Sequence, residues 1–185
     1  MNRYDLASEA ARVMHRPGEG PVRSLALLVV VPAAGPEAYA QRLRTLIGAA
    51  IDIVRSADFD QEDVPVDALP QWFIELSNEE SVTGGNDDAG NEGKRRYLLT
   101  RDSRPWGSGD WIYCFEPGLR AWSWWDVTLG VDGRVNVWVD TKGEAHIACE
   151  ELWWAVHVSG ALMVEPIVLE SAEVWRGQES LPAIS

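Results

Sequence analysis

The stretch from residue 120 to residue 161 holds the residues with the most suggestive chemistry. It contains six of the ten tryptophans, and polar or ionisable residues alternate with them. Tryptophan supplies a large contact area and polar neighbours fix the orientation of a ligand, so this composition suits a recognition surface. The candidate binding residues are those expected on one side of the predicted strands: Trp122, Trp124, Asp126, Asn136, Trp138 and His146.

The same tryptophans have an alternative, structural role. If another part of the chain covers this face, the indole N–H groups are satisfied internally and the face binds nothing. Most tryptophan in folded proteins is largely buried, which favours this alternative.

Asp126 and His146 are the pair with the greatest catalytic potential. If Trp138 lies between them on the middle of three strands, their backbones are about 9.6 Å apart, because neighbouring strands are about 4.8 Å apart. This separation exceeds hydrogen-bond reach, so the two side chains would flank a substrate or a partner side chain. No serine has a GxSxG context, so a hydrolase elbow is not indicated.

No metal or cofactor is predicted. His146, Cys149, Glu150 and His157 come closest to a ligand cluster, but their spacing matches neither HExxH nor paired CxxC motifs. The loop before residue 36 contains neither GxGxxG nor GKS/GKT, so a nucleotide fold is not indicated.

The apolar alternation of residues 123–140 predicts the hairpin that positions the tryptophans. A three-residue loop at 131–133, with Gly133 left-handed, pairs Leu129 with Val135 and gathers the aliphatic side chains on one face. A two-residue loop mixes apolar and polar residues on both faces, so the pattern favours the longer loop.

A second hairpin is predicted directly after the first. Residues 141–143 are expected to turn the chain, with Gly143 left-handed, into a third strand that places His146 opposite Trp138.

Periodicity predicts the remaining elements. Pro36 to Val54 is an amphipathic helix, Leu25 to Val31 is a buried central strand, and Cys149 to Ser159 is a heavily buried helix. Further strands are predicted at Arg95 to Arg101, Asp110 to Phe115 and Ile167 to Trp175. The predicted core includes Leu46, Ile47, Ile51, Val127, Leu129, Val137 and Trp153.

The predicted fold class is α+β. An antiparallel sheet of about five or six strands packs its aliphatic face on two main helices, 36–54 and 149–159. A length of 185 residues fits a single domain, 1–185. An acidic, Gly- and Asn-rich segment at 77–93 is expected to be a mobile loop, and 178–185 a frayed tail.

The net charge of −13 constrains the partner class. Phosphate contacts need clusters of Lys and Arg, so neither a nucleic acid nor an anionic membrane is predicted as a partner. The charge fits a solvated surface or a basic protein partner. Two cysteines without a CxxC motif, and no recognisable signal peptide, predict a reducing, cytoplasmic location.

The favoured function is a non-enzymatic, cytoplasmic protein-binding module of the inhibitor or immunity class, using the acidic, Trp-rich sheet face. One alternative is a small-molecule-binding protein or enzyme that uses Asp126, Trp138 and His146. Another is a structural or assembly component that associates with itself through the same face. The oligomeric state is left open.

Overall fold

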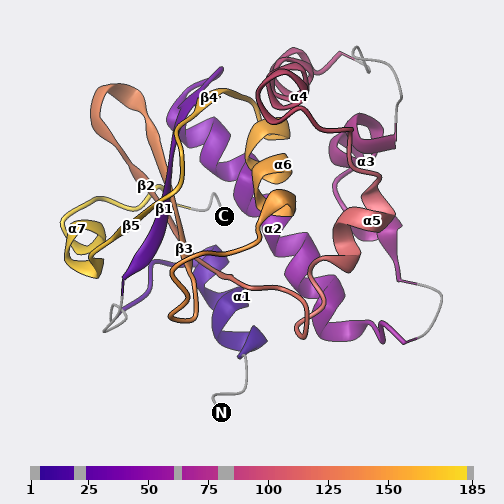
Figure 1. Ribbon diagram of the computed structural model, residues 1–185, viewed down its shortest axis with the longest axis horizontal. Helices are drawn as coiled ribbons and strands as arrows, with labels where there is room; N and C mark the ends of the chain where they lie inside the picture. The colour runs from indigo at the N-terminus through magenta and orange to yellow at the C-terminus, as the bar shows by residue number, and fades with distance from the viewer. Residues whose placement is uncertain (1–4, 19–23, 61–63, 79–85, 183–185) are drawn as a thin grey trace.

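The computed structural model describes residues 5–18, 24–60, 64–78 and 86–182 (Figure 1). Within these ranges the chain forms seven α-helices and a five-stranded antiparallel sheet, so the predicted α+β class and strand number are confirmed.

The sheet is built around β1, Leu25–Pro32, as predicted. On one side β1 pairs with β3, Val135–Asp140, which pairs in turn with β2, Ser123–Leu129. On the other side β4, Ala161–Val164, pairs with the end of β1, and β5, Val168–Glu170, pairs with its start.

Helices lie on both sides of this sheet. In Figure 1, α2 and α6 lie on one side of the sheet and the short α7 lies on the other. The helices in chain order are α1 (Leu6–Met14), α2 (Pro36–Ser56), α3 (Gln71–Asn78), α4 (Asp88–Arg101), α5 (Ser108–Tyr113), α6 (Glu150–Val158) and α7 (Ala172–Arg176), with 3-10 turns η1 (Val66–Ala68) and η2 (Val131–Gly133).

Helix α2 begins and is buried as its sequence predicts. Pro36 occupies the start, where a missing N–H costs no hydrogen bond, and Glu37 lies in the positive first turn. Its apolar stripe is buried, including Leu46, Ile47 and Ile51 of the predicted core.

The main core draws on more than two helices. Side chains of α1, α3, α4 and α5 join those of α2, α6 and the strands, among them Val13, Phe73, Tyr97 and Trp111. The prediction of packing on two main helices alone is therefore not confirmed. The prediction for Leu129 was wrong: this residue is 38% exposed, because it lies at the turn end of β2.

The first hairpin has the predicted register. Leu129 pairs with Val135, and the loop 131–133 closes with Gly133 at a φ of 73°. The register shifts between Trp124 and Asp126, which is a bulge that the sequence did not disclose.

The second hairpin does not form. The free edge of β3 pairs with β1, with Trp138 opposite Leu27, and residues 141–148 run on as turns and loop. Gly143 is left-handed, at a φ of 92°, but within this loop.

Two predicted strands are helices. Arg95 to Arg101 forms the second half of α4, and Asp110 to Phe115 lies largely in α5. In α4, Glu92 pairs with both Arg95 and Arg96 at helical spacing, which supports the helix locally. The third predicted strand, 167–175, is split between β5 and α7.

Much of the predicted loop 77–93 is helical as well. Residues 77–78 end α3 and residues 88–93 begin α4, while 79–85 lie outside the described residues. Asp87 caps α4, since its side chain accepts a hydrogen bond from the backbone N–H of Gly90 at 2.9 Å. At Gly93 an added Cβ would lie 1.7 Å from the carbonyl oxygen of His157, so only glycine allows α4 to lie this close to α6.

The segment 178–182 is packed, and the prediction of a frayed tail was wrong there. The backbone N–H of Leu181 donates to Val127, and that of Leu129 donates to Glu179, so this segment covers the outer edge of β2. Residues 183–185 are outside the described part of the chain.

A search of the described helices found none with the length and apolarity required to cross a membrane.

Candidate functional site

The predicted Trp-rich binding face is covered by the fold. Trp122, Trp124 and Trp138 are each fully buried, at 0% exposure. The bulge in β2 sends Trp122 and Trp124 into the main core, whereas Trp138 packs on the other face with Trp175 of α7. The indole N–H of Trp138 donates to Thr128 at 2.8 Å, as the structural alternative requires.

Asp126 is the centre of a buried polar cluster. Its carboxylate accepts hydrogen bonds from Arg44 Nη2 at 2.8 Å, from the indole N–H of Trp175 at 2.9 Å and from the hydroxyl of Ser180. The side chain is 0% exposed and that of Arg44 is 3% exposed, so the charged pair is removed from solvent. Asp126 therefore has a structural role.

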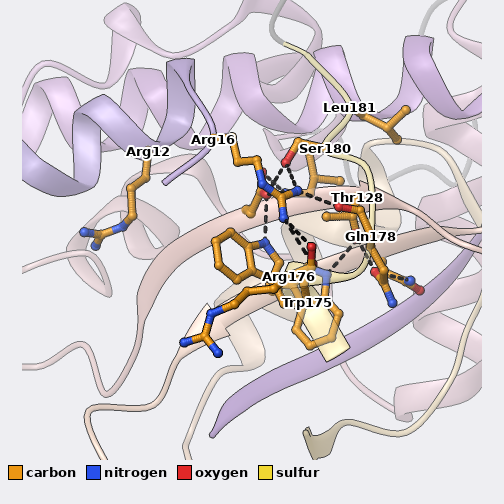
Figure 2. Close-up of polar contacts among 12 residues, drawn as sticks. Arg12, Arg16, Thr128, Trp175, Arg176, Gln178, Ser180 and Leu181 are labelled. Carbon is orange, nitrogen blue, oxygen red and sulfur yellow. Dashed lines mark hydrogen bonds and ion pairs between the residues drawn. The ribbon is translucent and has the colours of Figure 1, made fainter. Parts of the chain in front are cut away.

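Figure 2 shows Arg16, from the N-terminal part of the chain, among residues of the C-terminal segment beside this cluster. Arg16 lies beside Trp175, with its guanidinium 4.5 Å from the ring, and donates to the carbonyl oxygen of Gln178 and to Ser180. The amide oxygen of Gln178 accepts from Asn136, another of the predicted binding residues. The face that Asp126, Asn136 and Trp138 share is thus occupied by the chain's own C-terminal segment.

A second buried cluster uses Trp122. Its indole N–H donates to Glu151 Oε1 at 2.6 Å, and the neighbouring Arg120 forms an ion pair with Glu9 at 2.7 Å. Burial raises the pKa of Glu9 to about 7 and lowers the pKa of Arg120 to about 9. Glu9 of α1 also accepts a hydrogen bond from the backbone N–H of Trp124, so this second cluster joins α1 to β2.

The arrangement required by the enzymatic alternative is absent from the described residues. His146 is exposed in the loop after β3 and does not pair with Trp138, while Asp126 is bound by Arg44. Burial raises the pKa of the Cys149 thiol to about 12, so it is protonated at neutral pH. Among the described residues no group of three or more His, Cys, Asp or Glu side chains is placed to hold a metal ion.

An open groove elsewhere combines aromatic rings with carboxylates. It has a volume of about 540 Å³ and lies where the C-terminal end of α2 meets the segment after α5. We call it the acidic groove; it is lined by Val54, Ala57, Asp58, Phe59, Asp60, Tyr113, Glu116, Pro117 and Leu119.

Exposed apolar side chains form its contact surface. Tyr113 is 40% exposed and Leu119 is 72% exposed, and the ring of Phe59 packs edge-on against Tyr113 at a centroid distance of 5.7 Å. The tyrosine ring is thus held in place before anything binds, which lowers the entropic cost of a contact.

The groove has negative potential from its carboxylates and from the C-terminal ends of two helices. Asp58, Asp60 and Glu116 contribute carboxylates, and no Lys or Arg is found among the described residues that line it. The C-terminal ends of α2 and α5 both lie at the groove, and each carries a partial negative charge. Aromatic faces and carboxylates together suit the guanidinium or ammonium group of another chain.

Part of this groove is visible in the sequence as a short acidic and aromatic motif that was not among the predicted site residues. Asp58-Phe59-Asp60 places an aromatic residue between two acids directly after the long helix. The prediction of a strand at 110–115 gave no indication of the second half, in which Tyr113, the last residue of helix α5, packs against Phe59.

A scan against protein-family models finds no match to this chain, and searches of curated proteins and of solved structures find none either.

Proposed function

We propose that this protein is a non-enzymatic binding module that holds a basic protein partner in the acidic groove, as inhibitor and immunity proteins hold theirs. The observation that carries the proposal is the composition of the groove: exposed, preorganised apolar side chains surrounded by carboxylates, with no cation in the described lining.

The partner presents at least one Arg or Lys in this proposal. Its cation lies over the ring of Tyr113 and between the carboxylates of Asp60 and Glu116, while its aliphatic stem covers Leu119. Charges at the rim steer association and set specificity, and the buried aromatic contact supplies most of the affinity.

A pair of charge-reversal variants tests the groove. Wild-type protein and the variants Asp60→Lys and Glu173→Lys are immobilised and used to capture partners from the cell of origin. Both variants change the net charge equally, but Glu173 is exposed on α7, on the opposite side of the sheet. We expect a protein of basic isoelectric point that is retained by wild type and Glu173→Lys and lost from Asp60→Lys.

The purified partner then allows a measurement of affinity by titration calorimetry. Tyr113→Ala is expected to weaken binding by about 2 kcal/mol if the ring is the central contact. Val174→Ala, at a residue 42% exposed on α7, is the control and should have no effect. Equal binding to all four variants, or a partner of acidic isoelectric point, would refute the proposed site.

The cytoplasmic location belongs to the same proposal. It is supported by Cys114 and Cys149, which are not joined in a disulfide.

A further inference from the structure

A second cavity has the opposite electrostatic character. It has a volume of about 730 Å³ and lies between the C-terminal half of α4, helix α6 and strand β4. Cavities of about 300–1,000 Å³ are typical of sites for small molecules. It shares no lining residue with the acidic groove, so it is a separate site.

The walls of this cavity are held rigidly. Helices α4 and α6 touch at Gly93, where an added Cβ would lie 1.7 Å from the carbonyl oxygen of His157. Gly160, at a φ of 108°, makes a further close contact with Ala89 where α6 turns into β4. Because the backbones of α4 and α6 lie in close contact at Gly93, the two walls that they form are fixed relative to each other, and the cavity is preformed rather than opened by a ligand.

Most of the cavity is apolar. Trp153 of α6 and Met163 of β4 contribute to its lining, together with Ile147 and Ile167. Met163 is 47% exposed, and its neighbour Leu162 is 36% exposed. An apolar molecule in the cavity would remove this surface from water, which is favourable in proportion to the area covered.

The charges at the cavity are mainly positive. Arg96 and Arg101 line it with one carboxylate, Glu150, although the whole chain has 29 acidic and 16 basic residues. Arg96 is also paired with Glu92 beside the cavity, and both of these side chains are partly exposed. Arg101 stacks on Trp153, with its guanidinium 4.4 Å from the ring, and pairs with Glu150. Both members of that pair are partly exposed, so the pair contributes little and Arg101 can exchange Glu150 for a ligand anion.

We infer that this cavity binds a small amphipathic carboxylate, with the carboxylate on Arg96 and Arg101 and the apolar body against Trp153 and Met163. A guanidinium fork matches a carboxylate in two hydrogen bonds, and its stacking on an indole fixes its direction. The thiol of Cys149 and the imidazole of His157 complete the wall as uncharged groups, since burial raises the pKa of the first and lowers that of the second.

Titration calorimetry with decanoate and with the uncharged decanol tests the inference. Wild-type protein is expected to bind one decanoate saturably in the submillimolar range and decanol at least about tenfold more weakly. Arg101→Gln should weaken decanoate binding about tenfold or more, because a hydrogen bond to a charged group is lost. Arg95→Gln is the matched control, since Arg95 is likewise an arginine of α4 in a partly exposed ion pair, with Glu92, but does not line the cavity.

A second pair of variants leaves Arg101 and Glu150 themselves unchanged. Met163→Glu places a carboxylate at the cavity and should abolish decanoate binding, whereas Leu169→Glu, at a residue 46% exposed on β5, should not. The inference is overturned if wild-type protein shows no saturable decanoate binding, if decanol binds as tightly, or if each control variant weakens binding as much as its partner.

Discussion

Replacing Asp126 by Asn tests whether the buried cluster serves the fold. The amide nitrogen cannot accept the indole N–H of Trp175, now 2.9 Å from the carboxylate, and Arg44 loses its counter-charge while 3% exposed. Removing one partner of a buried pair costs about 3–5 kcal/mol, because the other charge is left uncompensated. We therefore expect Asp126→Asn to lower the free energy of unfolding by about 3–5 kcal/mol.

Urea unfolding followed by fluorescence and circular dichroism measures this loss. Asp52→Asn is the matched control: Asp52 also pairs with an arginine of α2, but its side chain is 72% exposed, and the expected loss is below about 1 kcal/mol. In a double-mutant cycle Asp126→Asn and Arg44→Met should be strongly non-additive, because the second change removes the stranded charge. A loss below about 1 kcal/mol for Asp126→Asn, with additive effects, would refute the structural role and reopen this face as a binding site.

Two further predictions concern the contact of α4 with α6. Gly93→Ala should destabilise the protein in urea unfolding by about 1–3 kcal/mol or more, because the added Cβ would overlap a backbone carbonyl. Gly109→Ala is the control: nothing lies within 4 Å of an added Cβ there, so it should be neutral or stabilise the protein by up to about 1 kcal/mol. His157 has its pKa lowered from 6.5, chiefly by burial, so the unfolded chain takes up the proton first as pH falls. The contribution of His157 to the free energy of unfolding is present above about pH 6.5 and is lost as the pH falls towards the lowered pKa of the folded state. The loss is at most about 1.4 kcal/mol per pH unit, measured as the difference between wild type and His157→Asn. Equal pH dependence of wild type and His157→Asn would contradict this prediction.

The sequence predicted the elements in which pattern and packing agree. The continuous apolar run of β1, the long stripe of α2 and the register of the first hairpin were all correct, because each is set by many residues with one period. Helices α4 and α5 were mistaken for strands because seven- and six-residue windows rich in Tyr, Leu, Trp and Ile fit either period. In α4 a long-range contact favours the helix: Lys94, fully buried, donates to the carbonyl oxygen of Leu76 in α3 at 2.7 Å.

The predicted Trp-rich face differs from the structure for two physical reasons. A one-residue bulge between Trp124 and Asp126 moves the side chains before it to the opposite face of the sheet. No local sequence pattern indicates this bulge. Strand β3 pairs with β1, which is about a hundred residues distant in sequence. The prediction of a third strand carrying His146 was based on local sequence alone and so did not include this pairing. A polar and aromatic composition is equally typical of a recognition surface and of a buried hydrogen-bonded cluster.

Many arginines of this protein stack on tryptophan rings. Among the described residues six tryptophans have a guanidinium over the ring, and all of these arginines except Arg12 also form an ion pair. The ring contacts are Arg12 with Trp125, Arg16 with Trp175, Arg42 with Trp72, Arg44 with Trp124, Arg101 with Trp153 and Arg120 with Trp122. The buried charges of the described residues balance, since Arg44, Lys94 and Arg120 are matched by Glu9, Asp126 and Glu151. The net charge of −13 is therefore carried by the remaining residues. Tryptophans that first indicated a binding face thus hold arginines together with their carboxylate partners in the fold, and the excess negative charge remains outside these pairs. In the proposed function this excess charge, which includes the carboxylates of the acidic groove, would steer a basic partner.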